Sequence, residues 1–226
     1  MRIIRRAIDE SRPALSEYES KQVLASYGIP VTREILVHDS QDLLTACREI
    51  GYPVVLKGCS SQVSHKTEKD LIRIDIRNET EAFEAYEHIM MNVTGVEGAV
   101  MAQEMLTGKR ELVIGMTRDP QFGPCVMFGL GGIFTEILQD IAFRVAPLNT
   151  GDAMEMMQEI RGYKILEAVR GMEAADLTAL SEILIAVGRI GLENEKVKEI
   201  DINPTIICGS KAVAADALIV LDQRAC

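Results

Sequence analysis

The sequence predicts a mixed α/β fold of the α+β kind, and three observations support this prediction. First, segments with helical periodicity alternate with β-branched segments of alternating polarity, which are typical of strands. Second, several neighbouring strands are separated by turns of only a few residues, which favours antiparallel pairing because parallel strands need long crossovers. Third, 47% of the 226 residues are hydrophobic and 26% are charged, which is ordinary for a chain that buries its own core.

Capping signals and strand patterns alternate in the N-terminal part of the chain. Ser16 and Glu19 form a capping-box pattern before a helix that Gly28 would end, and Asn78 with Glu81 repeats the pattern. The expected elements, in order, are a helix over 16–27, a strand over 31–37, a helix over 39–49, strands over 53–57 and 71–77, and a helix over 78–91. A Gly- and Asn-containing stretch near 92–98 is the best boundary between two subdomains, 1–97 and 98–226.

Strands dominate the second half, apart from one long helical region. Thr107-Gly108 predicts a turn between two apolar strands, and Gly209-Ser210 predicts a second turn. The expected elements are strands over 98–106, 110–117 and 124–132, a loosely alternating strand-like segment over 134–148, helices over 150–191 with a break near Gly171, and a strand–turn–strand unit over 196–221.

Charge and composition exclude several classes of function. Lys and Arg total 24 against 34 Asp and Glu, so the net charge of −10 opposes binding to nucleic acid and anionic lipid. No stretch approaches the roughly 20 apolar residues of a membrane span. The five cysteines are odd in number, scattered and without a CxxC pattern, which predicts reduced thiols in the cytoplasm rather than a disulfide or zinc framework.

An acidic strand is the first candidate site. Glu199, Asp201 and Asn203 share one face of the predicted strand because side chains alternate with a period of two. Asp216 lies in the following strand segment and could come to the same face through a hairpin. Oxygen ligands of this kind suit Mg²⁺, which takes one or two carboxylates together with substrate phosphates. A solvated strand face is the alternative explanation.

Three further features are compatible with phosphate chemistry. Lys57 ends an apolar strand, where its ammonium could bind nucleotide phosphates or simply be exposed. The segment Gly129–Gly132 could bring backbone N–H groups against a phosphate, or be an ordinary turn. His65 lies in a polar loop, where an imidazole can accept and pass on a phosphoryl group, although a surface histidine is the simpler explanation.

Taken together and in this order, these features resemble a known family. The similarity lies in three runs, PVVLKGCSSQVSHKTE (53–68), the segment 103–148 and EIDINPTIICGSKAVAADALIVL (199–221), and it extends over about residues 16–221. They resemble the ATP-grasp β subunit of ADP-forming acyl-CoA synthetases. The pattern GxGGxFxExxxDxxxR is matched by Gly129, Gly131, Gly132, Phe134, Glu136, Asp140 and Arg144.

The resemblance implies an ATP-grasp fold in which two subdomains enclose a cleft for ATP or ADP and Mg²⁺. It assigns nucleotide binding to Lys57, to the hinge residues Gln103, Glu104, Met105 and Leu106, and to Glu111, Gly131, Gly132 and Arg144. It assigns metal binding to Asp201, Asn203 and Asp216. It also makes His65 the catalytic residue, because His65 matches the histidine of the family's HK(S/T)(D/E) motif, which relays a phosphoryl group.

The resemblance also implies a partner. The family's CoA-binding half is a separate α subunit or a fused region, so a hetero-oligomer is expected that interconverts acyl-CoA, phosphate and ADP with carboxylate, CoA and ATP. The acyl group could be acetate, succinate or an aryl acid. A nucleotide-binding regulatory module without turnover is the alternative, because Asp70 and Leu71 replace the two glycines that usually follow the histidine motif.

Overall fold

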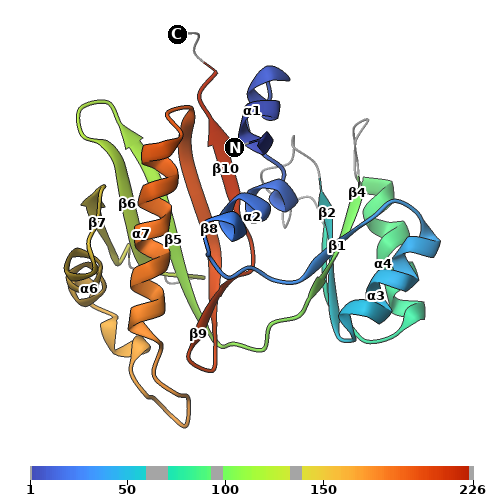
Figure 1. Ribbon diagram of the computed structural model, residues 1–226. Helices are drawn as coiled ribbons and strands as arrows, with labels where there is room; N and C mark the ends of the chain where they lie inside the picture. Colours follow the sequence, from blue (N-terminus) through green and yellow to red (C-terminus); the bar gives the residue numbers. More distant parts are fainter. Residues whose placement is uncertain (1, 60–70, 93–98, 133–138, 224–226) are drawn as a thin grey trace. The chain divides into compact units, whose positions relative to one another are not determined.

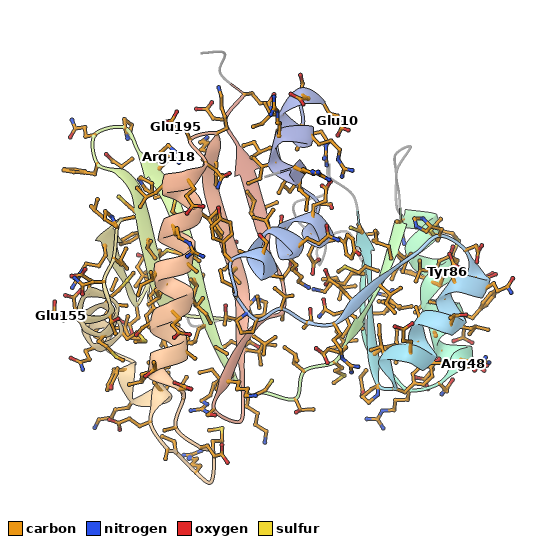
Figure 2. All side chains as sticks on the ribbon, in the orientation of Figure 1. Glu10, Arg48, Tyr86, Arg118, Glu155 and Glu195 are labelled. Atoms are coloured by element: carbon orange, nitrogen blue, oxygen red, sulfur yellow. The ribbon has the colours of Figure 1, made fainter. Side chains whose placement is uncertain are left out.

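The computed structural model describes residues 2–59, 71–92, 99–132 and 139–223. Contacts divide the chain into two compact units, and each unit has its own sheet. Unit 1 comprises Met1–Leu15, Glu19–Val31 and Thr107–Cys226, and unit 2 comprises Ser16–Tyr18 and Thr32–Leu106. Exposed charged side chains, among them Arg48, Glu155 and Glu195, project from the outer surfaces of the units (Figure 2).

Unit 2 is built on a four-stranded antiparallel sheet with the order β1-β4-β2-β3. Its strands are β1 (Glu34–Val37), β2 (Val54–Cys59), β3 (Ile72–Ile76) and β4 (Ala99–Glu104). The helices α3 (Ser40–Ile50) and α4 (Glu79–Asn92) lie side by side on one face of this sheet (Figure 1). The core between them contains Leu43, Leu56, Ile89 and Val100.

Local sequence signals explain where the helices of unit 2 begin and end. The Asp39 carboxylate accepts hydrogen bonds from the backbone N–H groups of Gln41 and Asp42, each at 2.8 Å, and so caps α3. Gly51 ends the same helix with a φ of 89°, which favours glycine. Asn78 Oδ1 accepts from Glu81 N at 3.0 Å at the start of α4.

Unit 1 is built on a larger antiparallel sheet with the order β10-β8-β5-β6-β7, and β9 also pairs with β8. Its strands are β5 (Arg110–Asp119), β6 (Gly123–Leu130), β7 (Ile141–Val145), β8 (Val197–Cys208), β9 (Lys211–Ala214) and β10 (Leu218–Leu221). One face is covered by α6 (Thr150–Glu159) and α7 (Leu177–Glu193), with the 3₁₀ helix η1 (Tyr163–Leu166) between them (Figure 1).

The small residues of α7 bring this helix close to the sheet. A Cβ atom at Gly188 would lie 3.2 Å from both the Cβ of Ala146 and the Cγ2 of Val126. Around this contact, Leu184 and Val187 of α7 belong to the same buried core as the sheet residues. The helix-covered face is therefore the apolar face of the sheet, and polar residues on β8 must lie on the other face.

The N-terminal segment completes unit 1. The helix α1 (Arg2–Asp9) buries Ile4 and Ala7, and the next segment runs beside β10, where Leu15 N donates to Ile219 O at 2.9 Å. The helix α2 (Glu17–Ser26) follows and has its first two residues in unit 2. None of the helices among the described residues is long and apolar enough to span a bilayer.

The predicted mixed fold is confirmed, with differences in detail. The helix α1 was not expected, and the region 196–221 contains three strands instead of two. Of the strand expected over 134–148, the structure describes residues 139–148, and these include β7. The units interleave along the chain instead of meeting at one boundary near 97, because β4 pairs between β1 and β2, and the N-terminal segment pairs with β10.

Candidate functional site

The acidic strand of unit 1 is β8. Ile200 and Ile202 are buried, whereas Glu199 and Asn203 are exposed and Asp201 is half-buried. This alternation places the three polar residues on the face of the sheet opposite α7, as the period-two pattern predicted. Asp216 lies in the connection between β9 and β10, two residues before Leu218, and Leu218 pairs with Asp201. The polar face of β8 and this connection therefore meet around Asp201.

Asp201 has an unusual electrostatic environment. Burial raises the pKa of its carboxyl from 3.8 to about 6, and the negative charges of Glu199 and Asp216 act in the same direction. Ionising all three carboxyls here is therefore unfavourable without a compensating cation. The arrangement suits Mg²⁺, because one or two carboxylates and phosphate oxygens suffice for this ion. Within the described ranges, no group of three or more His, Cys, Asp or Glu side chains is arranged to bind a metal by itself.

Glu111 and the glycine pair lie on the same sheet face as Asp201. Gly115 of β5 pairs with Asp201. Glu111 is separated from Gly115 by an even number of positions along β5, so both residues lie on the same face of the sheet. The backbone N–H of Gly131 donates to Glu111 O at 2.8 Å. A Cβ at Gly131 would lie 2.8 Å from backbone atoms of Glu111 and Leu112, and one at Gly132 would lie 2.6 Å from Glu111 Oε2. These glycines therefore let the chain turn directly beside the Glu111 carboxylate.

Arg144 lies on the opposite, helix-covered face of this sheet. It pairs with Val126 across β6 and β7, and Val126 belongs to the helix-covered face. Its guanidinium forms an ion pair with Glu159 of α6, with Nη1 to Oε2 at 2.9 Å. The hydrogen bond to Arg144 lowers the pKa of the Glu159 carboxyl. The structure thus brings Glu111, Gly131, Gly132 and Asp201 to one face of the sheet and places Arg144 on the other.

In unit 2, Lys57 and Gln103 share a sheet face. Lys57 pairs with Met101 and Val55 with Gln103, so Lys57 and Gln103 both point away from the face packed against α3 and α4. Both are buried, although the sequence alone allowed an exposed lysine. Lys57 Nζ donates to Glu17 Oε1 at 2.7 Å. Sequence reasoning missed Glu17, because the two residues are 40 positions apart and no motif connects them.

The predicted hinge follows β4. The Glu104 carboxylate accepts from the backbone N–H and the Nε of Arg33, at 2.8 and 3.1 Å. Met105 and Leu106 are half-buried and lie outside any strand. Unit 2 ends at Leu106 and unit 1 resumes at Thr107, so these residues lie directly at the junction of the two units along the chain.

The remaining predicted residues lie outside the described part of the chain or at its border. His65, Asp70, Phe134 and Glu136 are outside the described residues. Leu71, the first residue described after 59, is 1% exposed and belongs to the core of unit 2, and its carbonyl accepts from Gly58 N at 2.8 Å. Leucine at this position therefore has a packing explanation.

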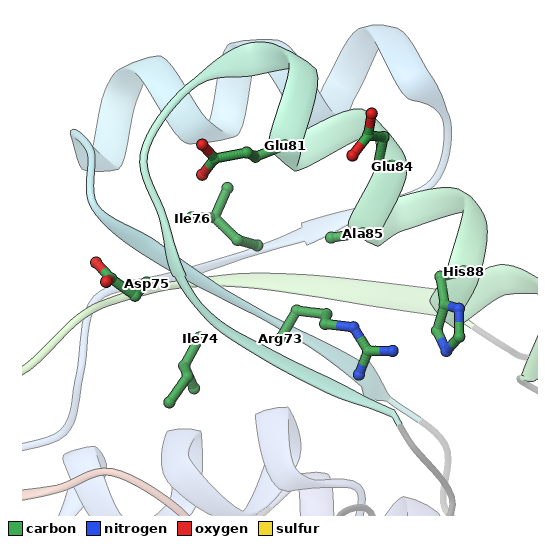
Figure 3. Close-up of a pocket in the computed structure, with 8 residues that line it drawn as sticks. All are labelled: Arg73, Ile74, Asp75, Ile76, Glu81, Glu84, Ala85 and His88. Carbon is green, nitrogen blue, oxygen red and sulfur yellow. The ribbon is translucent and has the colours of Figure 1, made fainter.

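Two cavities lie apart from these residues. One of about 330 Å³ lies between β3 and α4, where Arg73, Glu84 and His88 surround it (Figure 3). Another of about 690 Å³ is bordered by Lys109, Arg170 and the buried Arg110, whose guanidinium donates to four backbone carbonyls. Among the residues assigned from the sequence, none lines either cavity.

Comparison with known proteins gives a consistent result. The ATP-grasp domain family matches residues 6–221. The β subunit of acetate–CoA ligase (ADP-forming) I from Pyrococcus furiosus is 45% identical over 224 residues, which cover 97% of this chain and 96% of that one. A solved acetyl-coenzyme A synthetase 1 from Ca. Korarchaeum cryptofilum, in complex with coenzyme A and Ca-AMPCP, is 43% identical with a TM-score of 0.94, covering 98% of this chain and 99% of that one.

A second structure of the Korarchaeum protein contains coenzyme A and Mg-AMPPCP. It is 42% identical with a TM-score of 0.86, again covering 98% of this chain and 99% of that one. In that structure a phosphohistidine segment points towards the nucleotide-binding site.

Proposed function

This chain belongs to the ATP-grasp domain family, alongside the β subunits of ADP-forming acetate–CoA ligases, and we propose that it is the nucleotide-binding subunit of such a ligase. The reaction converts acyl-CoA, phosphate and ADP into carboxylate, CoA and ATP, and is reversible. Beyond family membership, one observation carries the proposal: Glu111, the glycine pair and Asp201 lie on one sheet face of unit 1. Positioning and charge neutralisation dominate phosphoryl transfer, and this face can supply both.

Several residues are proposed to contact the nucleotide. Lys57 and the segment Gln103–Leu106 are proposed to contact the phosphates and the adenine, and the glycine pair beside Glu111 is proposed to approach the nucleotide with its backbone. Asp201, Asn203 and Asp216 would hold Mg²⁺. When bound, Mg²⁺ neutralises phosphate charge. For Arg144 we propose a structural role instead, because its ion pair with Glu159 joins β7 to α6.

His65 is the proposed phosphoryl carrier. In the ATP-forming direction an imidazole nitrogen would attack the phosphorus of the phosphorylated intermediate formed with the partner subunit, and the bond from phosphorus to that donor would break. A β-phosphate oxygen of ADP would then attack phosphorus while the P–N bond breaks. A structure of the Korarchaeum relative in which a phosphohistidine segment points towards the nucleotide-binding site supports phosphoryl transfer through a histidine in general. The burial of Leu71 favours the enzyme over the regulatory alternative, because packing accounts for at least one of the two replaced glycines.

The partner is proposed to be a CoA-binding α subunit, since the Pyrococcus relative is itself a β subunit. The acyl group would be selected mainly by that partner. We also propose a cytoplasmic location, with which the free thiols of Cys47, Cys59, Cys125 and Cys208 agree.

Calorimetry of the full chain with ADP tests the nucleotide and metal sites together. Wild type should bind ADP more tightly with Mg²⁺ than with EDTA, and Asp201→Asn should reduce this Mg²⁺ effect by roughly tenfold, about 1.4 kcal/mol. Glu159→Gln is the matched control, because it removes an acidic group from the opposite side of the same sheet. Failure of wild type to bind Mg·ADP would contradict the function, and equal affinity of Asp201→Asn would contradict the metal site.

Phosphoryl labelling tests His65. Incubation with [γ-³²P]ATP should give an acid-labile, alkali-stable label on the chain, and His65→Asn should abolish it with little change in nucleotide affinity. His88→Asn, which changes a half-buried histidine of α4, should retain the label. No label in wild type, even with the partner subunit present, would support the regulatory module instead.

A further inference from the structure

Unit 2 contains a buried ion pair that no sequence motif predicted. Lys57 Nζ lies 2.7 Å from Glu17 Oε1, and the two side chains are only 7% and 1% exposed. Lys57 lies on β2 and Glu17 in the first turn of α2. We propose that Glu17 is a positioning residue that holds the Lys57 ammonium in place for the nucleotide phosphates. This inference rests on the proposed function, in which Lys57 contacts those phosphates.

The burial of Lys57 gives the first reason. A lysine has a flexible four-carbon stem and a strongly hydrated ammonium, so its usual position is in solvent. Lys57 instead lies opposite Met101, which is fully buried, and a buried charge is tolerated only when it is paired. Glu17 supplies the opposite charge, and the short bond fixes the direction in which the ammonium points. An ammonium has three donors, so a bond to Glu17 is compatible with contacts to phosphate oxygens.

The placement of Glu17 gives the second reason. A carboxylate in the first turn of a helix is stabilised by the positive end of the helix dipole. The Glu17 carboxylate is therefore held in a fixed position and is not a mobile surface group. Protein kinases hold their nucleotide-binding lysine in a comparable way, with a strand lysine paired to a helix glutamate. The physical requirement is the same in both cases, because phosphate must meet a charge that is already oriented.

The same helix provides a matched control. Glu19 is also buried and ion-paired, but its partners are Arg6 and Arg12, with Arg12 Nη1 at 2.7 Å from Glu19 Oε2. Glu19→Gln therefore removes a buried, paired carboxylate from α2 and leaves the Glu17–Lys57 ion pair in place. A loss of nucleotide affinity caused only by damage to α2 would occur in both variants, whereas a loss caused by misplacement of Lys57 would occur only in Glu17→Gln.

The experiment compares Mg·ADP with adenosine, using the full chain and calorimetry. Glu17→Gln should weaken Mg·ADP binding at least tenfold, because the ammonium loses the charged partner 2.7 Å away that fixes its direction. Adenosine affinity should stay within twofold of wild type, since adenosine has no phosphate to meet Lys57. Lys57→Met should show the same selective loss, and the double variant Glu17→Gln/Lys57→Met should lose no more than Lys57→Met alone. Glu19→Gln should leave both affinities unchanged.

The outcomes separate this inference from the proposed function. If Glu17→Gln binds Mg·ADP like wild type while Lys57→Met does not, the inference is overturned and the function stands. If Lys57→Met also binds normally, the role of Lys57 in the proposed function is wrong. Loss of adenosine binding in Glu17→Gln would show general disruption and also overturn the inference. Should Glu17→Gln fail to fold, Glu17→Asp keeps the charge, shortens its reach, and should show the same selective loss in smaller degree.

Discussion

Among the proposed metal ligands, Asp201 has an unusual electrostatic environment. An aspartate that is half-buried between two other acidic groups is a poor choice for stability alone, because each neighbour and the loss of water oppose its ionisation. Perturbed carboxyls of this kind concentrate at functional sites. The raised pKa of Asp201 therefore agrees with a position that a cation occupies during function.

The pH dependence of stability follows from the same residue. Because the pKa of Asp201 in the folded chain is about 6, above its ordinary value of 3.8, the folded state holds this proton more tightly than the unfolded state. Its contribution to stability is complete below pH 3.8 and is lost as the pH rises through 6. Asp201→Asn should therefore be more stable than wild type above pH 6, by about 2–3 kcal/mol without metal.

Denaturation curves of both chains between pH 4 and 8 check this prediction, because titrating groups that do not interact with Asp201 cancel in the difference. The stability difference should grow between pH 4 and 7, and Mg²⁺ with ADP should reduce it. A difference that is independent of pH would count against the environment assigned to Asp201.

Residue-level prediction succeeded where the signal was local. The shared face of Glu199, Asp201 and Asn203 follows from strand periodicity alone, and the structure confirms it. Glu17 could not be found, because its pairing with Lys57 depends on how β2 and the start of α2 meet. The sheet face on which Arg144 lies could not be predicted either, since it depends on the register of β7 against β6.

At the scale of elements, the way β6 ends depends on glycine, which has no Cβ atom. Gly131 continues the pairing of β5 with β6 beyond Leu130 through its N–H bond to Glu111 O. A Cβ there would meet the backbone of Glu111 and Leu112 at 2.8–2.9 Å, and backbone atoms within a sheet cannot move aside as a flexible side chain can.

Gly131→Ala should therefore separate the end of β6 from β5 and destabilise the chain by about 1–3 kcal/mol. It should also weaken Mg·ADP binding, because Glu111 lies at the same point. Thermal unfolding and calorimetry measure the two effects. Thr117→Ala, an exposed change on the same face of β5, should alter neither, and a fully stable Gly131→Ala would show that this approach is less tight than described.

Elements with strong local signals were predicted well, whereas those stabilised by tertiary contacts were not. The helix predicted over 39–49 is observed as α3, which Asp39 caps and Gly51 ends. The short helix α1 has no acidic residue in its first turn, and it is held by the burial of Ile4 and Ala7 in the core of unit 1 and by the Arg6–Glu19 ion pair. Long-range packing of this kind leaves no pattern in the local sequence.

At the scale of the whole molecule, the division of the chain was the hardest feature to predict. Composition offered only the stretch 92–98 as a boundary, yet β4 completes the sheet of unit 2 after that stretch. The N-terminal segment then joins unit 1 through β10, near the other end of the sequence. Boundaries that are set by strand pairing across long sequence separations cannot be predicted from local composition. The mixed fold class could be predicted from the sequence.

Each unit has its own buried core, so the isolated chain should fold and bind Mg·ADP without a partner. It should not convert acyl-CoA, because the proposed reaction needs a CoA-binding subunit to form the species from which His65 takes its phosphoryl group. Adding that subunit should restore ATP formation from acyl-CoA, phosphate and ADP, measured with several acyl-CoAs. Turnover of acetyl-CoA by this chain alone, at rates of roughly 1–10³ per second, would contradict the division of labour between two subunits. Restoration only with the partner, and its loss again in His65→Asn, would place the nucleotide half of the chemistry in this chain.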